Sequence, residues 1–147
     1  MPDEQIRIVF EPLPDADLQR FLEDNVVNLS FARTGHTEWF PMGFFLRSDR
    51  GEWLGGCTGF IWGGWLQIRW LWVSEILRHR GYGTGLMDAA EAYGRERGAH
   101  HATLETHSFQ APEFYRKRGY VVFGTLDDYP PTHQKLFLRK RLVGPER

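Results

Sequence analysis

The chain has 147 residues and a mass of 17.2 kDa, which predicts a single domain over residues 1–147. Hydrophobic residues make up 41% of it and charged residues 25%, which excludes wholesale disorder. The net charge of −1 gives no sign of a basic surface for nucleic acid. The sequence has no apolar run long enough for a membrane span.

The first half of the chain shows the pattern of one helix and an antiparallel meander. Ile6–Glu11 alternates apolar and polar residues, which predicts a half-buried strand. A helix is expected from Asp15, with an apolar face at helical spacing and Gly35 as its stop. The pair Gly63-Gly64 is typical of a hairpin turn. The strands expected around it are Gly43–Ser48, Leu54–Trp62 and Trp65–Val73.

The second half places helices between strands. Residues 80–85 form a glycine-rich stretch, and a helical apolar period then runs to Gly98. Another helix is expected over Gln110–Arg118, with Pro112 in its first turn. Further strands are expected at His101–Thr106, Tyr120–Thr125 and Gln134–Arg141. The order β-α-β-β-β-α-β-α-β-β predicts an α/β fold of the α+β type, with a mixed, mostly antiparallel central sheet flanked by helices.

The glycine-rich stretch follows a strand and opens a helix, an arrangement suited to binding a phosphate group. Glycine lets the backbone turn tightly, and the unpaired N–H groups of a first helical turn attract an anion. An ordinary turn explains the same residues equally well. A mononucleotide loop would need Gly-Lys-Ser/Thr where Gly85-Leu86-Met87 stands. A dinucleotide-dependent oxidoreductase would need Gly or Ala in place of Leu86, although Glu105 lies at a suitable distance for a ribose.

From this loop onward the sequence resembles the GNAT superfamily of N-acetyltransferases. The family's loop reads Arg/Gln-x-x-Gly-x-Gly/Ala, and a later segment reads Asn-x-x-Ala-x-x-x-Tyr before a Gly-aromatic pair. The matching residues are Arg80, Gly83, Gly85, Ala111, Tyr115, Gly119 and Tyr120. Ser108 stands in place of the Asn, and residues 108–115 and 129–142 are similar to a bacterial subgroup of the family. The resemblance covers residues 65–142 and implies the acyl-CoA N-acyltransferase fold.

The resemblance implies that the chain uses acetyl-coenzyme A. The pyrophosphate would sit on the N–H groups of residues 81–86, and the pantetheine arm would pair with residues 71–73 like a missing strand. The residues implied to bind the cofactor are Leu71, Trp72, Val73, Arg78, Arg80, Gly81, Tyr82, Gly83, Thr84, Gly85, Leu86, Ser108, Ala111 and Tyr115.

The reaction that the resemblance implies is direct attack of an amine on the acetyl carbonyl. Tyr115 matches the family's tyrosine and is the candidate acid for the coenzyme thiolate, with a packing role as its alternative. The main-chain N–H of Val73 is expected to hold the developing oxyanion. A base must deprotonate the amine, because amines of this kind are mostly charged at neutral pH. The candidate bases are Glu105, His107 and Glu75, beside a water chain without a dedicated base.

The acceptor is expected to be a primary amine of a small molecule, since no extended acidic run favours a basic peptide. Aromatic faces attract ammonium groups, and carboxylates add charge attraction. The candidate residues of the acceptor pocket are Glu52, Trp53, Trp62, Trp65, Trp70, Asp127, Asp128 and Tyr129. A non-catalytic acyl-CoA binding or sensing module on the same fold is the alternative function.

The remaining expectations concern compartment and assembly. The single cysteine, Cys57, excludes an internal disulfide, and it is expected to be a buried bystander. The sequence start lacks the pattern of a signal peptide, which favours a cytoplasmic protein. No metal is expected, because the adjacent His100 and His101 would point to opposite faces of a strand. A homodimer is possible by resemblance to the family.

Overall fold

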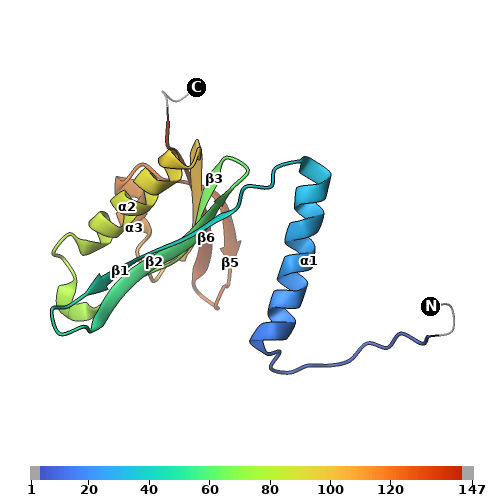
Figure 1. Ribbon diagram of the computed structural model, residues 1–147. Coiled ribbons are helices and arrows are strands. Elements are labelled where there is room, and N and C mark those ends of the chain that lie inside the picture. Colours follow the sequence, from blue (N-terminus) through green and yellow to red (C-terminus); the bar gives the residue numbers. More distant parts are fainter. Residues whose placement is uncertain (1–3, 144–147) are drawn as a thin grey trace. The chain divides into compact units, whose positions relative to one another are not determined.

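The computed structural model describes residues 4–143, which belong to two compact units (Figure 1). The first unit ends at Thr37, and the second begins at Glu38. The first unit holds helix α1 (Ala16–Thr34) and the segment before it. The second unit holds the sheet and the other helices, so it contains every residue that the sequence assigns to the cofactor or to the chemistry.

Helix α1 begins and ends where its sequence predicts. The carboxylate of Asp15 accepts a hydrogen bond from the Leu18 N–H at 2.8 Å and so caps the first turn. Gly35 takes the left-handed conformation at φ 75°, and its N–H donates to the Phe31 carbonyl at 2.9 Å. These two local signals set the length of the helix without help from packing.

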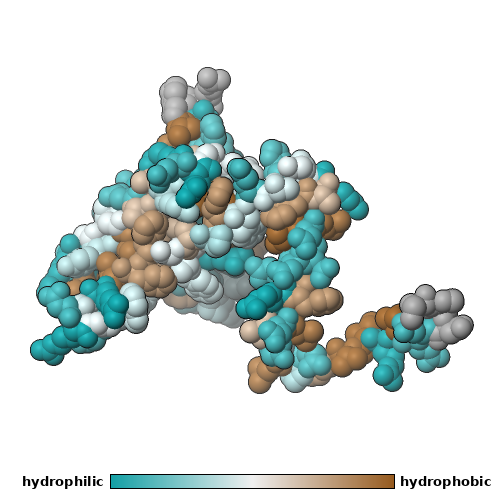
Figure 2. All heavy atoms as spheres, in the orientation of Figure 1, coloured by the Kyte–Doolittle hydropathy of each residue, from teal (hydrophilic) through white to brown (hydrophobic). Residues whose placement is uncertain are grey.

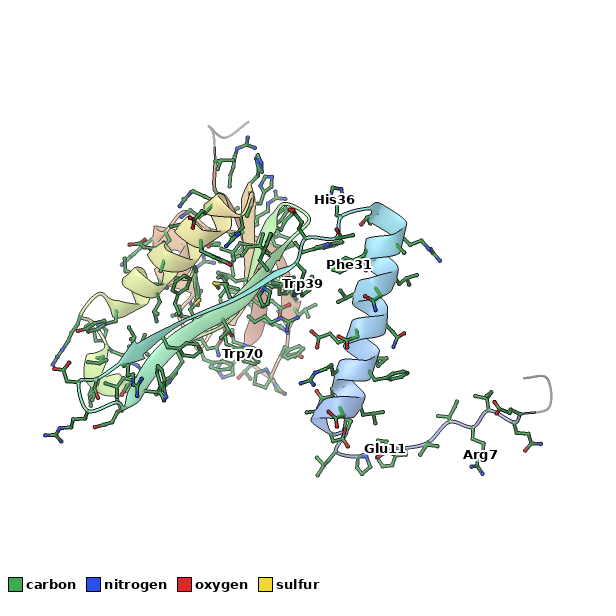
Figure 3. All side chains as sticks on the ribbon, in the orientation of Figure 1. Arg7, Glu11, Phe31, His36, Trp39 and Trp70 are labelled. Carbon is green, nitrogen blue, oxygen red and sulfur yellow. The ribbon has the colours of Figure 1, made fainter. Side chains whose placement is uncertain are left out.

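The strand predicted at Ile6–Glu11 does not form, and this prediction was wrong. Residues 4–14 have no regular secondary structure, and Figure 3 shows Arg7 and Glu11 on this extended segment. A strand needs a partner for its backbone N–H and C=O groups, and the described part of the first unit contains no other strand. Apolar side chains line this segment and α1 (Figure 2). An alternating pattern therefore shows only which side chains suit burial.

The second unit is a six-stranded sheet in the order β1-β2-β3-β4-β6-β5. Its neighbours pair antiparallel except β3 and β4, which pair parallel. The mixed, mostly antiparallel sheet confirms the predicted fold class. The strands are β1 (Phe40–Arg47), β2 (Trp53–Trp62), β3 (Trp65–Val73), β4 (His101–His107), β5 (Val121–Asp127) and β6 (Gln134–Arg141). The helices are the 3-10 helix η1 (Glu75–Leu77), α2 (Tyr82–Glu96) and α3 (Pro112–Lys117).

Helix α2 lies against one face of this sheet and builds the core with it (Figure 1). Leu86, Met87 and Ala90 are buried on the helix, with Leu66 and Leu104 among the buried residues of the strands. Because the side chains of a strand alternate between faces, the even-numbered residues of β4 point to the helices. Glu105 and His107 therefore lie on the opposite face.

Strands β3 and β4 separate soon after they meet. Their parallel pairing joins residues 65–67 to residues 101–103 and goes no further. On the other side of β3, Thr58 pairs with Trp70 and Gly59 with Ile68, so Arg69 is the extra residue of a bulge. A bulge bends its strand and strengthens the local twist. The second half of β3 thus leaves β4 and opens a wedge in the sheet.

Gly59 permits this bulge, and we expect that alanine at this position destabilises the fold. A Cβ on Gly59 would lie 2.0 Å from the backbone oxygen of Gln67, which only a shift of β3 can relieve. The free energy of unfolding should fall by about 1–3 kcal/mol in Gly59→Ala, measured by urea denaturation. Gly124→Ala is the matched control, because its Cβ would make ordinary contacts of 3.6 Å or more with Phe137. Equal stability of the two variants would contradict this reading of the bulge.

Candidate active site

A cavity of about 1120 Å³ occupies the wedge between β3 and β4. Its walls come from the second half of β3, the loop into α2, the end of β4, helix α3 and Lys135 of β6. Cavities of this order hold cofactors and drug-sized ligands. The parted strands thus make room for a ligand of considerable length.

Most of the site residues predicted from sequence meet at this cavity. Those that line it are Leu71, Trp72, Val73, Arg78, Gly81, Tyr82, Gly83, Thr84, Glu105, His107, Ala111 and Tyr115. Those outside its lining are Glu75, Arg80, Gly85, Leu86 and Ser108. Leu86 faces the core, and Ser108 instead joins β4 to β6, since its Oγ accepts from the Gln134 N–H at 2.9 Å.

The glycine-rich loop has the geometry that the sequence suggests. Gly81 takes the left-handed conformation at φ 85° directly before the first residue of α2. The first bond of this helix runs from the Gly85 N–H to the Gly81 carbonyl at 3.0 Å, so the N–H groups of residues 82–84 precede the helical ladder. No described side chain caps this end of α2. The loop therefore presents free donors and the positive end of the helix to the cavity.

Tyr115 reaches the same cavity from α3 and is 8% exposed. Its ring meets those of Phe114 and Tyr120 edge-on, with centroids 5.1 Å and 6.0 Å away. Burial, with a smaller contribution from nearby Cys57, raises the pKa of Tyr115 to about 12. The phenol therefore keeps its proton at neutral pH, as a proton donor must.

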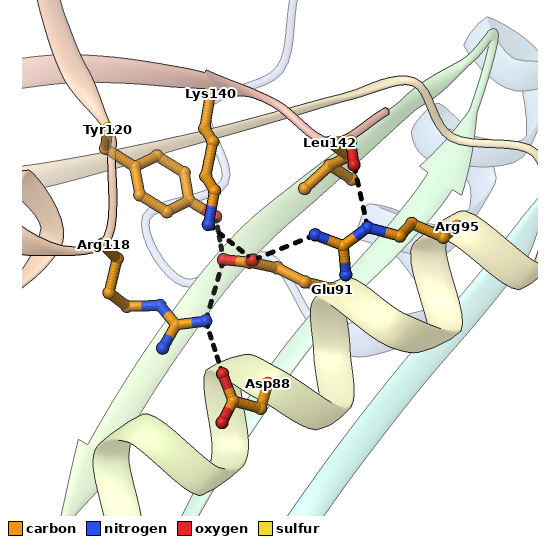
Figure 4. Close-up of polar contacts among 7 residues, drawn as sticks. All are labelled: Asp88, Glu91, Arg95, Arg118, Tyr120, Lys140 and Leu142. Carbon is orange, nitrogen blue, oxygen red and sulfur yellow. Dashed lines mark hydrogen bonds and ion pairs between the residues drawn. The ribbon is translucent and has the colours of Figure 1, made fainter. Parts of the chain in front are cut away.

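A buried carboxylate, Glu91, ties together the elements behind this wall of the cavity (Figure 4). Its Oε2 accepts a hydrogen bond from the Tyr120 hydroxyl at 2.9 Å, and Arg118 lies 3.2 Å from the same oxygen. Its Oε1 accepts from Lys140 at 2.7 Å. The contacts join α2 to the segment after α3 and to β6. Since Tyr120 packs on Tyr115, this cluster also fixes the wall from which Tyr115 reaches the cavity.

The other wall of the wedge carries charged and aromatic groups. Glu105 pairs with Lys135 at 2.9 Å, which raises the pKa of Lys135 because the carboxylate bonds to its charged form. The His107 ring stacks on Phe109 with centroids 5.1 Å apart. Of the predicted acceptor residues, Trp70 lines the cavity, and Figure 3 labels its side chain. Those outside the lining are Glu52, Trp53, Trp62, Trp65, Asp127, Asp128 and Tyr129.

Sequence reasoning missed Glu91 and several residues of the lining. Glu91 is four residues after Met87 and three before Gly94, so it falls on the apolar stripe of α2, and this is the signal that sequence offered. Phe109, Gln110 and Lys135 reach the cavity through long-range pairing and turn geometry. No spacing within the sequence indicates these three.

Two classes of site are not found in residues 4–143. These residues contain no group of three or more His, Cys, Asp or Glu side chains placed to hold a metal ion. None of the described helices has the length and apolar character needed to cross a membrane.

Comparison with known proteins decides the family. The profile of the acetyltransferase (GNAT) family matches residues 8–120. The chain belongs to this family. It is therefore an N-acetyltransferase, and acetyltransferases of this family use acetyl-coenzyme A.

Individual relatives agree with this assignment. Blasticidin-S acetyltransferase of Streptomyces morookaense is 40% identical over 95 residues, which are 64% of this chain and 70% of the relative. A crystal structure of an Agrobacterium tumefaciens acetyltransferase has a TM-score of 0.84 at 27% identity, over 92% of this chain and 99% of that one. The crystal structure of nourseothricin acetyltransferase has a TM-score of 0.62 at 28% identity, over 70% of this chain and 66% of that one.

Loss of the Glu91 charge should destabilise the protein strongly. Glu91→Gln leaves Lys140 and Arg118 without their shared counter-charge in a site where the Glu91 side chain is 3% exposed. We expect the free energy of unfolding to fall by about 3–5 kcal/mol. The control is Glu113→Gln, whose exposed pair with Arg116 should contribute less than about 1 kcal/mol. Urea denaturation of both variants measures the difference, and equal losses would contradict a structural role for this cluster.

Proposed function

We propose that this N-acetyltransferase transfers the acetyl group of acetyl-coenzyme A to a primary amine of a small molecule, by direct attack on the thioester. The observation that carries this proposal is the cavity between β3 and β4, which is lined by the glycine-rich loop before α2, by Tyr115, and by Glu105 and His107. The whole chain would act as one acetyltransferase domain.

The residues present fit acetyl-coenzyme A. The donors of residues 82–84 would hold the pyrophosphate. Residues 71–73 of β3 do not pair with β4, so backbone groups of this segment would pair with the amides of the pantetheine arm. Arg78 supports this segment, because its Nε donates to the Val73 carbonyl at 3.2 Å. Arg80, Gly85, Leu86 and Ser108 stay predictions from the family resemblance.

Three groups would carry the chemistry. The N–H of Val73 would stabilise the oxyanion that forms on the acetyl carbonyl. The phenol of Tyr115 would protonate the departing thiolate, because its raised pKa keeps it protonated beside the cavity. Glu105, His107 or Glu75 would take the proton of the amine, and of these Glu75 lies outside the cavity lining.

The acceptor would be an amine-bearing antibiotic or a molecule of similar chemistry. Two relatives carry the names of such compounds, and the first is 40% identical over 95 residues of this chain. Trp70 and Trp72 offer aromatic faces to the cavity, which suit a cationic amine. The pairing of Glu105 with Lys135 leaves little net charge to attract a basic peptide.

Removing the hydroxyl of Tyr115 should slow the chemical step. We expect Tyr115→Phe to lower kcat by about 10²–10⁴-fold, because the leaving thiolate loses its proton donor. The affinity for acetyl-coenzyme A, measured by calorimetry, should stay nearly unchanged. Tyr93→Phe on α2 is the matched control, since Tyr93 lies outside the cavity lining. An unchanged kcat in Tyr115→Phe, with chemistry rate-limiting, would remove Tyr115 from the mechanism.

The acceptor class can be tested with a panel of amines. Release of free coenzyme A should be faster with blasticidin S or nourseothricin than with lysine-containing peptides. We expect kcat/KM to favour the antibiotics by at least about tenfold. Turnover of the peptides without turnover of the antibiotics would contradict a small-molecule acceptor.

A further inference from the structure

A tight turn follows β4 and holds Gln110 against His107. The Gln110 N–H donates to the His107 carbonyl at 2.9 Å, and the Gln110 Oε1 accepts from the His107 N–H at 2.8 Å. The same Oε1 lies 3.1 Å from the hydroxyl of Thr106, which is 3% exposed. Gln110 is thus fixed through both its backbone and its side chain.

This turn also determines which end of the Gln110 amide faces the histidine. A backbone N–H can only donate, so the amide atom 2.8 Å from the His107 N–H must be the oxygen. That oxygen lies 3.3 Å from Nδ1 of the His107 ring. Because an amide oxygen only accepts, the hydrogen bond requires a proton on Nδ1. A neutral His107 then has its lone pair on Nε2.

We infer that Gln110 is a positioning residue that holds His107 in the Nδ1–H tautomer, and that Nε2 of His107 is the base that deprotonates the acceptor amine. The inference rests on the proposed function and selects one of its three candidate bases. Both residues line the cavity in the wedge. Gln110 acts through His107 and has no direct part in the reaction.

The surroundings favour His107 over the two carboxylates. Glu105 is held by Lys135 at 2.9 Å, and Glu75 lies outside the cavity lining. An imidazole is a side chain suited to taking a proton near neutral pH. Two aromatic rings also hold the His107 ring in place. It stacks on the Phe109 ring, and its centroid lies 5.6 Å from the centroid of the Tyr129 ring.

Charged groups from three strands lie around His107. Glu105 of β4 and Lys135 of β6 form an ion pair on the same face of the sheet. Arg69 of β3 lines the cavity, with its guanidinium over the Phe60 ring. His133 contacts Phe109 and lies outside the cavity lining.

The proton balance of the reaction is then complete. Nε2 of His107 takes one proton from the ammonium group, and the neutral amine forms a C–N bond with the acetyl carbon. The C–S bond breaks, and Tyr115 gives its proton to the sulfur. Tyr115 regains a proton from the nitrogen that becomes the amide, and His107 releases its proton to solvent. One proton leaves for each acetyl group transferred.

The tautomer can be observed directly by nitrogen NMR of protein carrying ¹⁵N-labelled histidine. We expect His107 to show a protonated Nδ1 and an unprotonated Nε2 at pH 8, without any substrate. His107→Gln assigns the signal by its disappearance, and His133→Gln is the matched control beside the same aromatic rings. Gln110→Ala should shift the His107 signals toward the Nε2–H form. A protonated Nε2 in the wild-type protein at pH 8 would overturn the inference.

The pH profile of kcat/KM tests the catalytic part. His107→Gln should lower kcat/KM by about 10²–10⁴-fold, while His133→Gln keeps the wild-type value. Gln110→Glu still accepts from Nδ1–H, and its carboxylate raises the pKa of His107. The acid limb of the profile should therefore move to higher pH by about one unit. An unmoved limb, or full activity in His107→Gln, would overturn the role of His107 as base.

These measurements separate the inference from the proposed function. The NMR experiment needs no acceptor and no turnover, so it tests only whether Gln110 sets the tautomer of His107. Suppose that Tyr115→Phe loses kcat but the acid limb of the kcat/KM profile does not move in Gln110→Glu. That result would support acetyl transfer and refute His107 as its base.

Discussion

The parting of β3 from β4 is the constraint on which the rest of the second unit depends. Parallel pairing ends after residues 65–67, and the bulge at Arg69 turns the following backbone away from β4. Backbone N–H and C=O groups that lose their strand partner need another one. The fold thus leaves one strand edge unsatisfied in the middle of a sheet, where a ligand with amide groups can complete the ladder. The glycine-rich loop, the phenol of Tyr115 and the ring of His107 line the cavity at this gap.

The buried Glu91 shows how the helices are held against such an interrupted sheet. A sheet with a wedge loses part of its own cross-strand support, and α2 and α3 border the wedge. Glu91 joins α2 to Tyr120, in the segment between α3 and β5, and to Lys140 of β6. Neither β5 nor β6 pairs with β3. A polar cluster is more directional than an apolar contact, so it fixes the orientation of these elements as well as their distance. This explains why a carboxylate occupies the apolar stripe of α2.

The sequence predicted those features that have a local cause. The caps at Asp15 and Gly35, the Gly63-Gly64 hairpin and the bounds of β3 and β6 depend on neighbouring residues, and they agree with the structure. The strand at Ile6–Glu11 was wrong because its pattern needed a partner that the described unit lacks. The cavity-lining residues Gly81, Gly83 and Thr84 were predictable because they belong to one local loop motif. Gln110 and Glu91 were not, since their roles come from a turn and from contacts far along the chain.

The burial of Tyr115 has a thermodynamic consequence for alkaline conditions. An unfolded chain releases a tyrosine proton near pH 10, whereas folding raises the pKa of Tyr115 to about 12. The stabilisation is complete below pH 10 and disappears as the pH climbs to 12. Cys57 behaves alike, because burial raises its pKa from 9.0 to about 11. The folded protein therefore loses stability between about pH 9 and 12, at pH values where the buried phenol of Tyr115 still keeps its proton.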